Sequence, residues 1–192
     1  MAICTQTLGG ITLDCTTSQG GIKSVWIAEY SSVEPSLTEV TPDVAEYNGN
    51  IKDYKKVTGF KTGSIDLFKK YEFRRGTANL TETHTADETT GNNYVTAELS
   101  MVFTKKDTAK RVEMAALSVG QLAVIVLDSN GKYWYMGYDD YVSASAGGSE
   151  SGTAKSDRNA YTITLKTESN SYCYEVDENL FKPVVPPTGE EE

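Results

Sequence analysis

The segment 119–141, VGQLAVIVLDSNGKYWYMGYDDY, constrains the fold more than any other part of the chain. The residues from Val119 to Leu127 are nearly all apolar, which is typical of a strand covered on both faces. A turn follows at 128–131, because Asn and Gly adopt the positive φ that a tight hairpin requires. After the turn, aromatic side chains alternate along a second strand. The segment therefore predicts a hairpin in the middle of a β-sheet, and nothing in it resembles a catalytic site.

Alternating apolar and polar residues predict most of the remaining secondary structure to be β. The further predicted strands are 22–30, 54–60, 64–75, 94–103, 160–166 and 171–176. The predicted core side chains on these strands and on the hairpin are Val124, Val126, Trp134, Met136, Ile163 and Leu165. We expect an antiparallel β-sandwich or barrel, mainly β, with one flanking α-helix.

One helix is predicted at 105–117, KKDTAKRVEMAAL. Thr104, followed three residues later by Asp107, resembles a capping box. An apolar stripe at helical spacing predicts the face that packs on a sheet. The stripe consists of Ala109, Val112, Ala116 and Leu117.

The longest predicted strand, 64–75, pairs in this interpretation with 94–103 and forms a hairpin of unusual length. At about 3.3 Å per residue the first strand would be roughly 40 Å long, about twice the usual length. The Thr-rich segment 76–93 between them has almost nothing to bury and is predicted to be an extended loop. The polar side chains on one face of this hairpin are Asp66, Lys70, Glu72, Arg74, Thr96, Glu98 and Ser100.

Length and turn residues predict one domain. The 192 residues suffice for a single core, and we place the β-rich domain at 1–176. The Pro-containing segment 31–50 is predicted to be an excursion, and the Gly- and Ser-rich segment 142–158 a second long loop. The Pro-rich acidic stretch 177–192 cannot join the interior of a sheet, and it is predicted to be either disordered or an extended arm that lies on a neighbour.

Charge and composition exclude several classes of function. The net charge of −9 argues against a protein that binds nucleic acid through phosphate contacts. No run approaches the ~20 apolar residues of a membrane span, and the N-terminus lacks the pattern of a signal peptide. The three Cys lack CxxC spacing, so we expect thiols in a reducing compartment rather than a zinc site. A Cys4–Cys15 bridge is the alternative.

No catalytic or metal-binding pattern is found. His84 is the only histidine, and it lies in the polar 76–93 segment without a nucleophile pattern beside it. The carboxylates at Asp139 and Asp140 match no calcium-loop spacing. The Gly-rich stretch 147–152 is neither GxGxxG nor a P-loop. We expect no enzyme activity, no cofactor and no metal.

The second half of the chain resembles bacteriophage tail tube proteins and related ring-forming tail components. The likeness rests on the helix at 105–117, the segment LAVIVLDSNGKYWYMGYDD at 122–140 with Gly137, and AGGSESGTAKSDRNAYTITLKTES at 146–169. The opening, GGITLDC at 9–15 and GGIKSVWIAEY at 20–30, is similar to the start of structural proteins from phages of gut Bacteroidetes, the crAss-like phages among them.

The resemblance implies a virion structural protein of the tail or neck, assembled in the host bacterial cytoplasm. Its partners would be copies of itself in a ring, commonly a hexamer, other tail or neck proteins, and DNA that passes without specific binding. No membrane contact is expected. The polar hairpin face (Asp66, Lys70, Glu72, Arg74, Thr96, Glu98 and Ser100) would line the lumen. The inter-ring contacts would come from Thr83, His84, Asp87, Glu88 and Asn92.

Cations on the candidate lumen strand do not fit a simply acidic channel. Lys70 and Arg74 lie on the polar face, with further cations beside them. Either these cations pair with Glu72 and Glu98 across strands, or the strand faces a neighbouring subunit.

A second function from a different class is a β-sandwich module that binds a ligand such as carbohydrate. Its stacking platforms would be Trp134, Tyr138 or Trp26, because aromatic ring faces bind sugars. Core packing is the alternative role of these rings.

Overall fold

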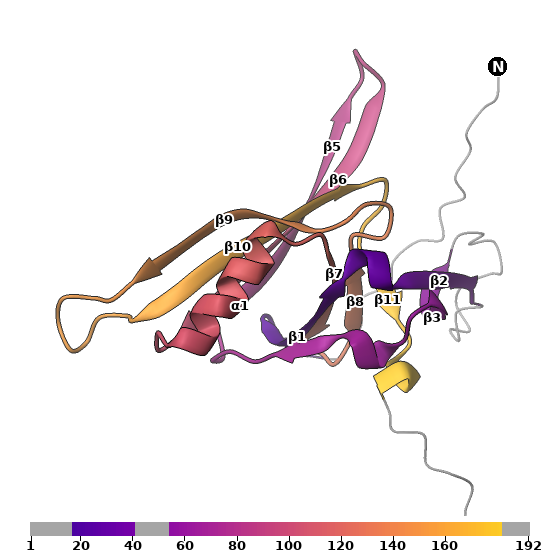
Figure 1. Ribbon diagram of the computed structural model, residues 1–192. Helices are drawn as coiled ribbons and strands as arrows, with labels where there is room; N and C mark the ends of the chain where they lie inside the picture. The colour runs from indigo at the N-terminus through magenta and orange to yellow at the C-terminus, as the bar shows by residue number, and fades with distance from the viewer. Residues whose placement is uncertain (1–16, 41–53, 182–192) are drawn as a thin grey trace, which may run out of the picture.

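A computed structural model describes residues 17–40 and 54–181. These residues form two β-sheets and one α-helix (Figure 1). The predicted class is confirmed, since the protein is mainly β and consistent with a sandwich flanked by one helix. The strands are β1 (Ile22–Glu29), β2 (Glu34–Glu39), β3 (Lys55–Thr62), β4 (Lys69–Tyr71), β5 (Ala78–Asp87), β6 (Asn92–Thr104), β7 (Leu122–Asp128), β8 (Tyr133–Met136), β9 (Ser143–Glu150), β10 (Ala160–Ser169) and β11 (Tyr174–Val176). The helices are α1 (Thr108–Val119) and the 3₁₀ turns η1 (Tyr30–Ser32), η2 (Ile65–Leu67) and η3 (Glu178–Phe181).

The larger sheet has seven strands in the order β2-β3-β11-β8-β7-β1-β4, and the smaller has four in the order β5-β6-β10-β9. Strand pairs are antiparallel except β11 with β3. The predicted 119–141 hairpin is confirmed as β7 and β8, both in the interior of the larger sheet. The first strand begins later than predicted, because Val119 ends α1 and Gly120 follows it as the C-cap.

The main core lies between the two sheets. Alternate residues of β6 and β10 face inward, and they meet apolar side chains from β1, β7 and β8. Five of the six predicted core residues are fully buried there: Val124, Val126, Met136, Ile163 and Leu165. Trp134 is the exception. It is half-buried at the margin and donates a hydrogen bond from Nε1 to Asp128 (3.1 Å).

A second apolar cluster covers the other face of the larger sheet. It contains Ile125 and Tyr135, which alternate with the residues of the main core along β7 and β8. This explains why β7 is apolar on both faces. Phe181 of η3 packs on this face, its ring 4.0 Å from that of Tyr133. The described beginning of the predicted arm, 177–181, therefore lies on the domain.

The predicted long strand 64–75 is wrong. Ile65–Leu67 form the turn η2, and only Lys69–Tyr71 pair with β1. Phe68, the one residue that breaks the alternation, is buried in the second apolar cluster, so the chain must bend to place it there. Gly63 permits the bend because its φ is +78° and an added Cβ would lie 2.4 Å from the Ser32 carbonyl oxygen.

The true partner of β6 is the Thr-rich segment that was predicted to be a loop. β5 pairs with β6 over ten residues, from Ala78 opposite Met101 to Asp87 opposite Asn92. Thr favours strands because its branched side chain fits a pleated, half-exposed surface. The hairpin of unusual length is therefore present, with a turn of only four residues, Glu88–Gly91, between its strands.

Two smaller predictions are also corrected. The segment 142–158 contains the edge strand β9, and the excursion 31–50 contains β2, whose Pro35 lies on an edge strand where proline is tolerated. Residues 41–50 of that excursion lie outside the described part of the chain.

The helix begins at Thr108 and is capped by Asp107, whose Oδ1 accepts a bond from the Lys110 N–H (2.8 Å). Of the predicted stripe only Leu117 is buried. Ala109, Val112 and Ala116 are exposed, because Met114 and Leu117 set the side of the helix that contacts the core.

Candidate functional site: the outer face and edges of the four-stranded sheet

The outer face of the four-stranded sheet carries small polar side chains. On β6, Leu99 and Met101 point into the core, so Glu98 and Ser100 point the other way. Their register partners on β5 and β10 extend the same face. We call this set the hydroxyl face. It comprises Asn79, Thr81, Thr83, Thr96, Glu98, Ser100, Thr162, Thr164, Lys166 and Glu168.

Every member of the hydroxyl face is exposed or half-buried, whereas α1 packs against the opposite face through Leu117. The few charges are balanced locally. Lys166 pairs with Glu168 at 2.9 Å, and it lies opposite Glu98 in the register. The hydrogen bond to Glu168 raises the pKa of Lys166. The face is therefore polar and nearly neutral, with hydroxyl groups as its main chemistry.

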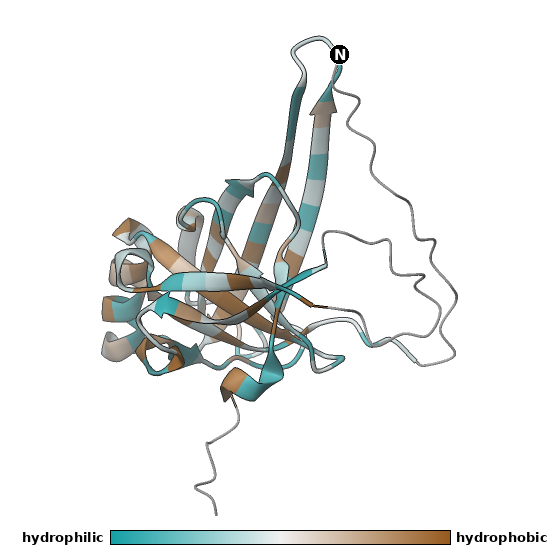
Figure 2. Ribbon diagram, turned by 90° about the vertical axis from the view of Figure 1, so that its right-hand side faces the viewer, coloured by the Kyte–Doolittle hydropathy of each residue, from teal (hydrophilic) through white to brown (hydrophobic). Residues whose placement is uncertain are grey.

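The β5–β6 hairpin projects well beyond the body of the protein (Figures 1 and 2). At its tip Asp87 accepts a bond from the Thr89 N–H (2.8 Å), and this backbone hydrogen bond lowers the pKa of the carboxyl group. Gly91 closes the turn with φ +72°. His84 contacts Asn93 across the hairpin, and its ring stacks at 6.5 Å from that of Tyr172.

The structure gathers the predicted inter-ring residues on this outer half of the hairpin, all with exposed side chains. They are Thr83, His84, Asp87, Glu88 and Asn92.

Both edges of the four-stranded sheet are open in the described part of the chain. β5 pairs only with β6, and β9 only with β10. β9 has the sequence SASAGGSE, and its side chains from Ser145 to Glu150 are exposed. A free edge presents unpaired N–H and C=O groups, to which another strand can be added. Small side chains on β9 would let such a strand approach closely.

The structure separates the predicted lumen residues into two groups. Thr96, Glu98 and Ser100 lie together on the hydroxyl face. Asp66, Lys70, Glu72 and Arg74 lie instead in or beside η2 and β4, at the edge of the other sheet. The reason is the bend at Phe68, described above. The predicted pairing across strands is not found for Lys70, which pairs with Glu72 two residues further along the same segment (2.6 Å), while Glu98 is on the other sheet.

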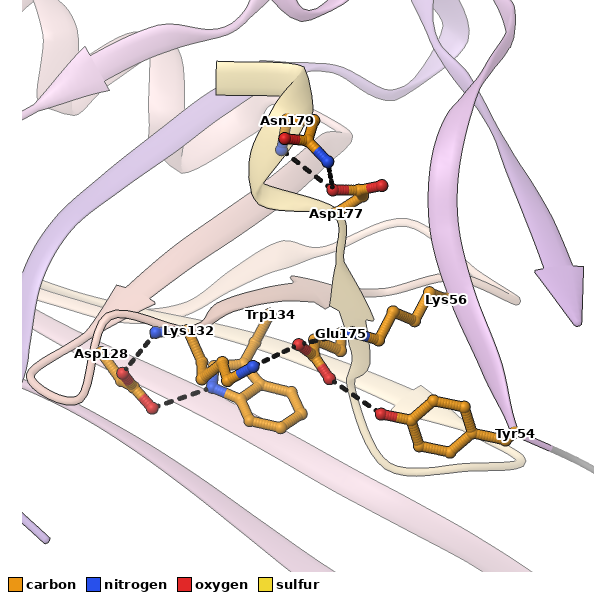
Figure 3. Close-up of polar contacts among 8 residues, drawn as sticks. All are labelled: Tyr54, Lys56, Asp128, Lys132, Trp134, Glu175, Asp177 and Asn179. Atoms are coloured by element: carbon orange, nitrogen blue, oxygen red, sulfur yellow. Dashed lines mark hydrogen bonds and ion pairs between the residues drawn. The ribbon is translucent and has the colours of Figure 1, made fainter. Parts of the chain in front are cut away.

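A polar network that the sequence did not reveal joins β3, β8 and β11 (Figure 3). Glu175 Oε1 accepts bonds from Lys56 Nζ and Lys132 Nζ, both at 2.9 Å, and Oε2 accepts one from Tyr54 Oη at 3.4 Å. Partial burial opposes ionisation, but the two ammonium groups prevail and lower the pKa of Glu175. The residues are far apart in sequence, so only the pairing of β11 with both β3 and β8 brings them together.

The aromatic residues proposed as sugar platforms contact other aromatic rings. Trp26 lies 5.6 Å from Tyr133 and 5.0 Å from Phe181, measured between ring centroids. Tyr138 meets Tyr174 edge to face at 5.2 Å. Trp134 is held at the core margin by its bond to Asp128. Carbohydrate binding stays an untested prediction from the sequence.

Among residues 17–40 and 54–181, no group of three or more His, Cys, Asp or Glu side chains could hold a metal ion. No helix in this part is long and apolar enough to cross a membrane. Cys173 is free, and burial raises the pKa of its thiol. Cys4 and Cys15 lie outside the described residues, so the alternative of a bridge between them is not decided.

Comparisons with known proteins identify no relative. The chain matches no protein-family model, no curated protein and no solved structure. The resemblance to tail tube proteins therefore rests on the sequence motifs alone. Function has to be argued from the geometry of the four-stranded sheet.

Proposed function

We propose that the protein is a virion structural protein that oligomerises into a ring around the DNA channel of a phage tail or neck. The observation that carries this proposal is the four-stranded sheet. Its hydroxyl face is exposed, its two edges are open, and one of its hairpins projects far from the body.

Ring closure would join unlike edges of neighbouring subunits. If β9 of one subunit pairs with β5 of the next, the contact is heterologous, and repeated rotation closes a ring. The joined sheets then form one barrel, in which no open edge remains. This removes the exposed ladder groups that a single subunit leaves at β5 and β9.

The hydroxyl face would line the channel of that barrel. Hydroxyl groups are well solvated and carry no charge, and Lys166 is already paired with Glu168. Passing DNA would find few free cations, so its phosphates would gain little from counterion release and would not be held.

The β5–β6 tip would contact the next ring or a neighbouring tail or neck protein. Its exposed residues, His84 and Asp87 among them, supply polar groups for such a contact. In this proposal the protein resides in the virion tail.

Electron microscopy and mass photometry of the purified protein test whether it forms rings. Two proline variants of β9 test whether ring formation depends on the free edge of that strand. Proline is introduced separately at Gly147 and at Gly148, where an added Cβ meets only ordinary contacts of 3.6 and 3.4 Å. In an antiparallel ladder one of two adjacent N–H groups points to the partner strand and the other away from it. The variant that loses the outward N–H should fold normally and fail to form rings.

The other proline variant loses a backbone hydrogen bond to β10 within the subunit. It is the matched control for damage to the fold. A wild-type protein that stays monomeric at high concentration and beside its tail partners would count against the proposal. So would rings that survive in the proline variant with native stability.

A further inference from the structure

A groove of about 430 Å³ lies between the edge strand β4 and the helix α1. Its lining combines three kinds of side chain. Tyr71, Phe103 and Met114 are apolar or aromatic, and Lys69, Lys70 and Lys110 are cationic. Glu72 and Glu113 are acidic, so the lysines outnumber the carboxylates by one. Tyr71 holds the two walls together through a bond from its hydroxyl group to Glu113 (3.0 Å). The groove can therefore accept a ligand that is part apolar and part anionic.

The two segments that supply most of the lining are opposite in charge to the whole chain. The segments 69–75 and 105–113 contain eight Lys and Arg side chains and three Asp and Glu side chains, a local net charge of +5. The whole chain carries −9, so the rest of it carries −14. Lys69 is exposed and pairs with no acidic residue in the described part of the chain. An acidic segment brought here would meet unmatched positive charge.

An acidic segment follows the last described residue in the sequence. The ring of Phe181 lies 5.0 Å from that of Trp26, and Lys70 Nζ lies 5.8 Å from the centre of the same Trp26 ring. The described structure therefore ends one aromatic ring away from Lys70, on the face of the seven-stranded sheet opposite to Tyr71. The residues that follow Phe181 are KPVVPPTGEEE. At about 3.3 Å per residue, the nine residues 182–190 can span roughly 30 Å.

We propose that the segment 183–192 docks in this groove of its own subunit. Val184 and Val185, with the prolines beside them, would lie over Tyr71 and Phe103. Glu190, Glu191 and Glu192 would pair with the lysines of the rim. The groove borders the free edge of β4, which has β1 as its only partner in the described residues. A docked segment would cover that edge with a proline-containing chain that cannot extend the sheet.

Each ion pair at such an exposed site is weak, so the docking depends on several charges acting together and on the short tether. It should also depend on salt, because the Debye length falls from about 10 Å at 0.1 M to about 4 Å at 0.5 M.

Zero-length cross-linking of the full chain tests the proposal. A carbodiimide joins a carboxylate to an amine only when the two are in contact. The reaction is run on an equal mixture of ¹⁴N- and ¹⁵N-labelled protein at low concentration, and the fractions of monomer mass and of dimer mass are digested and mapped separately. We expect links from Glu190–Glu192 to Lys69, Lys70 or Lys110. The two linked peptides should carry the same label, light with light or heavy with heavy, because both come from one chain. Their yield should fall at least five-fold in 0.5 M NaCl.

Lys155 is the matched control, since it is exposed in the loop between β9 and β10. The triple variant Lys69→Gln, Lys70→Gln, Lys110→Gln removes the three reactive amines and so verifies the assignment of the links, which Lys155→Gln should leave in place. Absence of the links overturns the proposal, as do equal yields at Lys155. Mixed light–heavy pairs would also overturn it, since they mean docking on another copy. Retention of the chain by duplex DNA, with no such links, would assign the groove to a nucleic acid instead. Because the measurement is made on monomers, failure of ring assembly leaves the result unaffected.

Discussion

Replacement of Glu175 by Gln tests the network that joins β3, β8 and β11. The substitution keeps the shape of the side chain and removes its charge. Lys56 and Lys132 would then face a neutral amide in place of a carboxylate. β11 is only three residues long, so the side-chain bonds of Glu175 are a large share of what holds it in the sheet.

The expected cost follows from the exposure of the partners. The side chains of Glu175 and Lys56 are 17% and 24% exposed, so their bond is well shielded from water. A hydrogen bond to a charged group in such a place contributes about 1.5 kcal/mol. Lys132 is 58% exposed and adds little. We therefore expect Glu175→Gln to lower the free energy of unfolding by about 1.5 kcal/mol.

Urea unfolding at neutral pH measures this cost. With an m-value of about 2 kcal/mol per M, the midpoint should fall by about 0.7 M. The matched control is Glu34→Gln, which breaks the exposed Lys61–Glu34 pair on the same sheet, where both side chains are more than half exposed (58% and 59%). That variant should unfold at the wild-type midpoint.

The difference should also depend on pH with a definite sign. The pKa of Glu175 is lower in the folded protein than its ordinary value of 4.5. Its charge therefore stabilises the fold fully above that ordinary value, and the effect is lost as the pH falls through the lower, folded pKa. The wild type and Glu175→Gln should converge in acid. A gap that equals that of Glu34→Gln, or that persists unchanged at pH 3, would refute the reasoning.

Two further stability predictions concern the fold around the site. Gly137→Ala should cost about 2–4 kcal/mol, because φ is +79° and the new Cβ would lie 2.6 Å from Val142 Cγ2 and 2.7 Å from the Asp140 carbonyl oxygen. Gly131→Ala, at φ +89° with nothing within 4 Å, should cost only about 1 kcal/mol in the same urea assay, and equal losses would contradict the steric account. Leu99→Ala should cost about 3 kcal/mol because Leu99 is fully buried between the sheets, while Val112→Ala, at a position 56% exposed, should cost under about 0.5 kcal/mol. A similar loss from both would mean that the helix face carrying Val112 is covered in solution.

Much of the fold could be read from local pattern. The apolar run before the 128–131 turn and the clean alternation from Tyr161 to Leu165 depend only on which face of a strand is buried. β7, β8 and β10 were predicted for that reason. So were five of the six core residues, because a long apolar side chain on the inward face of a central strand has nowhere else to go.

The pattern of polar and apolar residues gave wrong predictions in three segments. The Thr-rich segment 76–93 has almost nothing to bury, yet its backbone completes a ladder with β6. Apolar and polar residues alternate along 64–75, yet this stretch does not form one long strand, because the chain bends to bury Phe68. On α1 the apolar stripe through Val112 is exposed, because Met114 and Leu117 are the residues that the neighbouring sheet meets.

The sequence by itself determined that the chain forms a β-rich sandwich with one helix and an exposed, polar, two-faced hairpin strand at 94–103. Only the tertiary structure decided which strand pairs with 94–103, which strand edges are left open, and which charged residues line the groove between β4 and α1. The physical reason is range. Alternation and turn chemistry act between residues a few positions apart, whereas strand partners, open edges and charge clusters depend on which distant segments bury their apolar faces together.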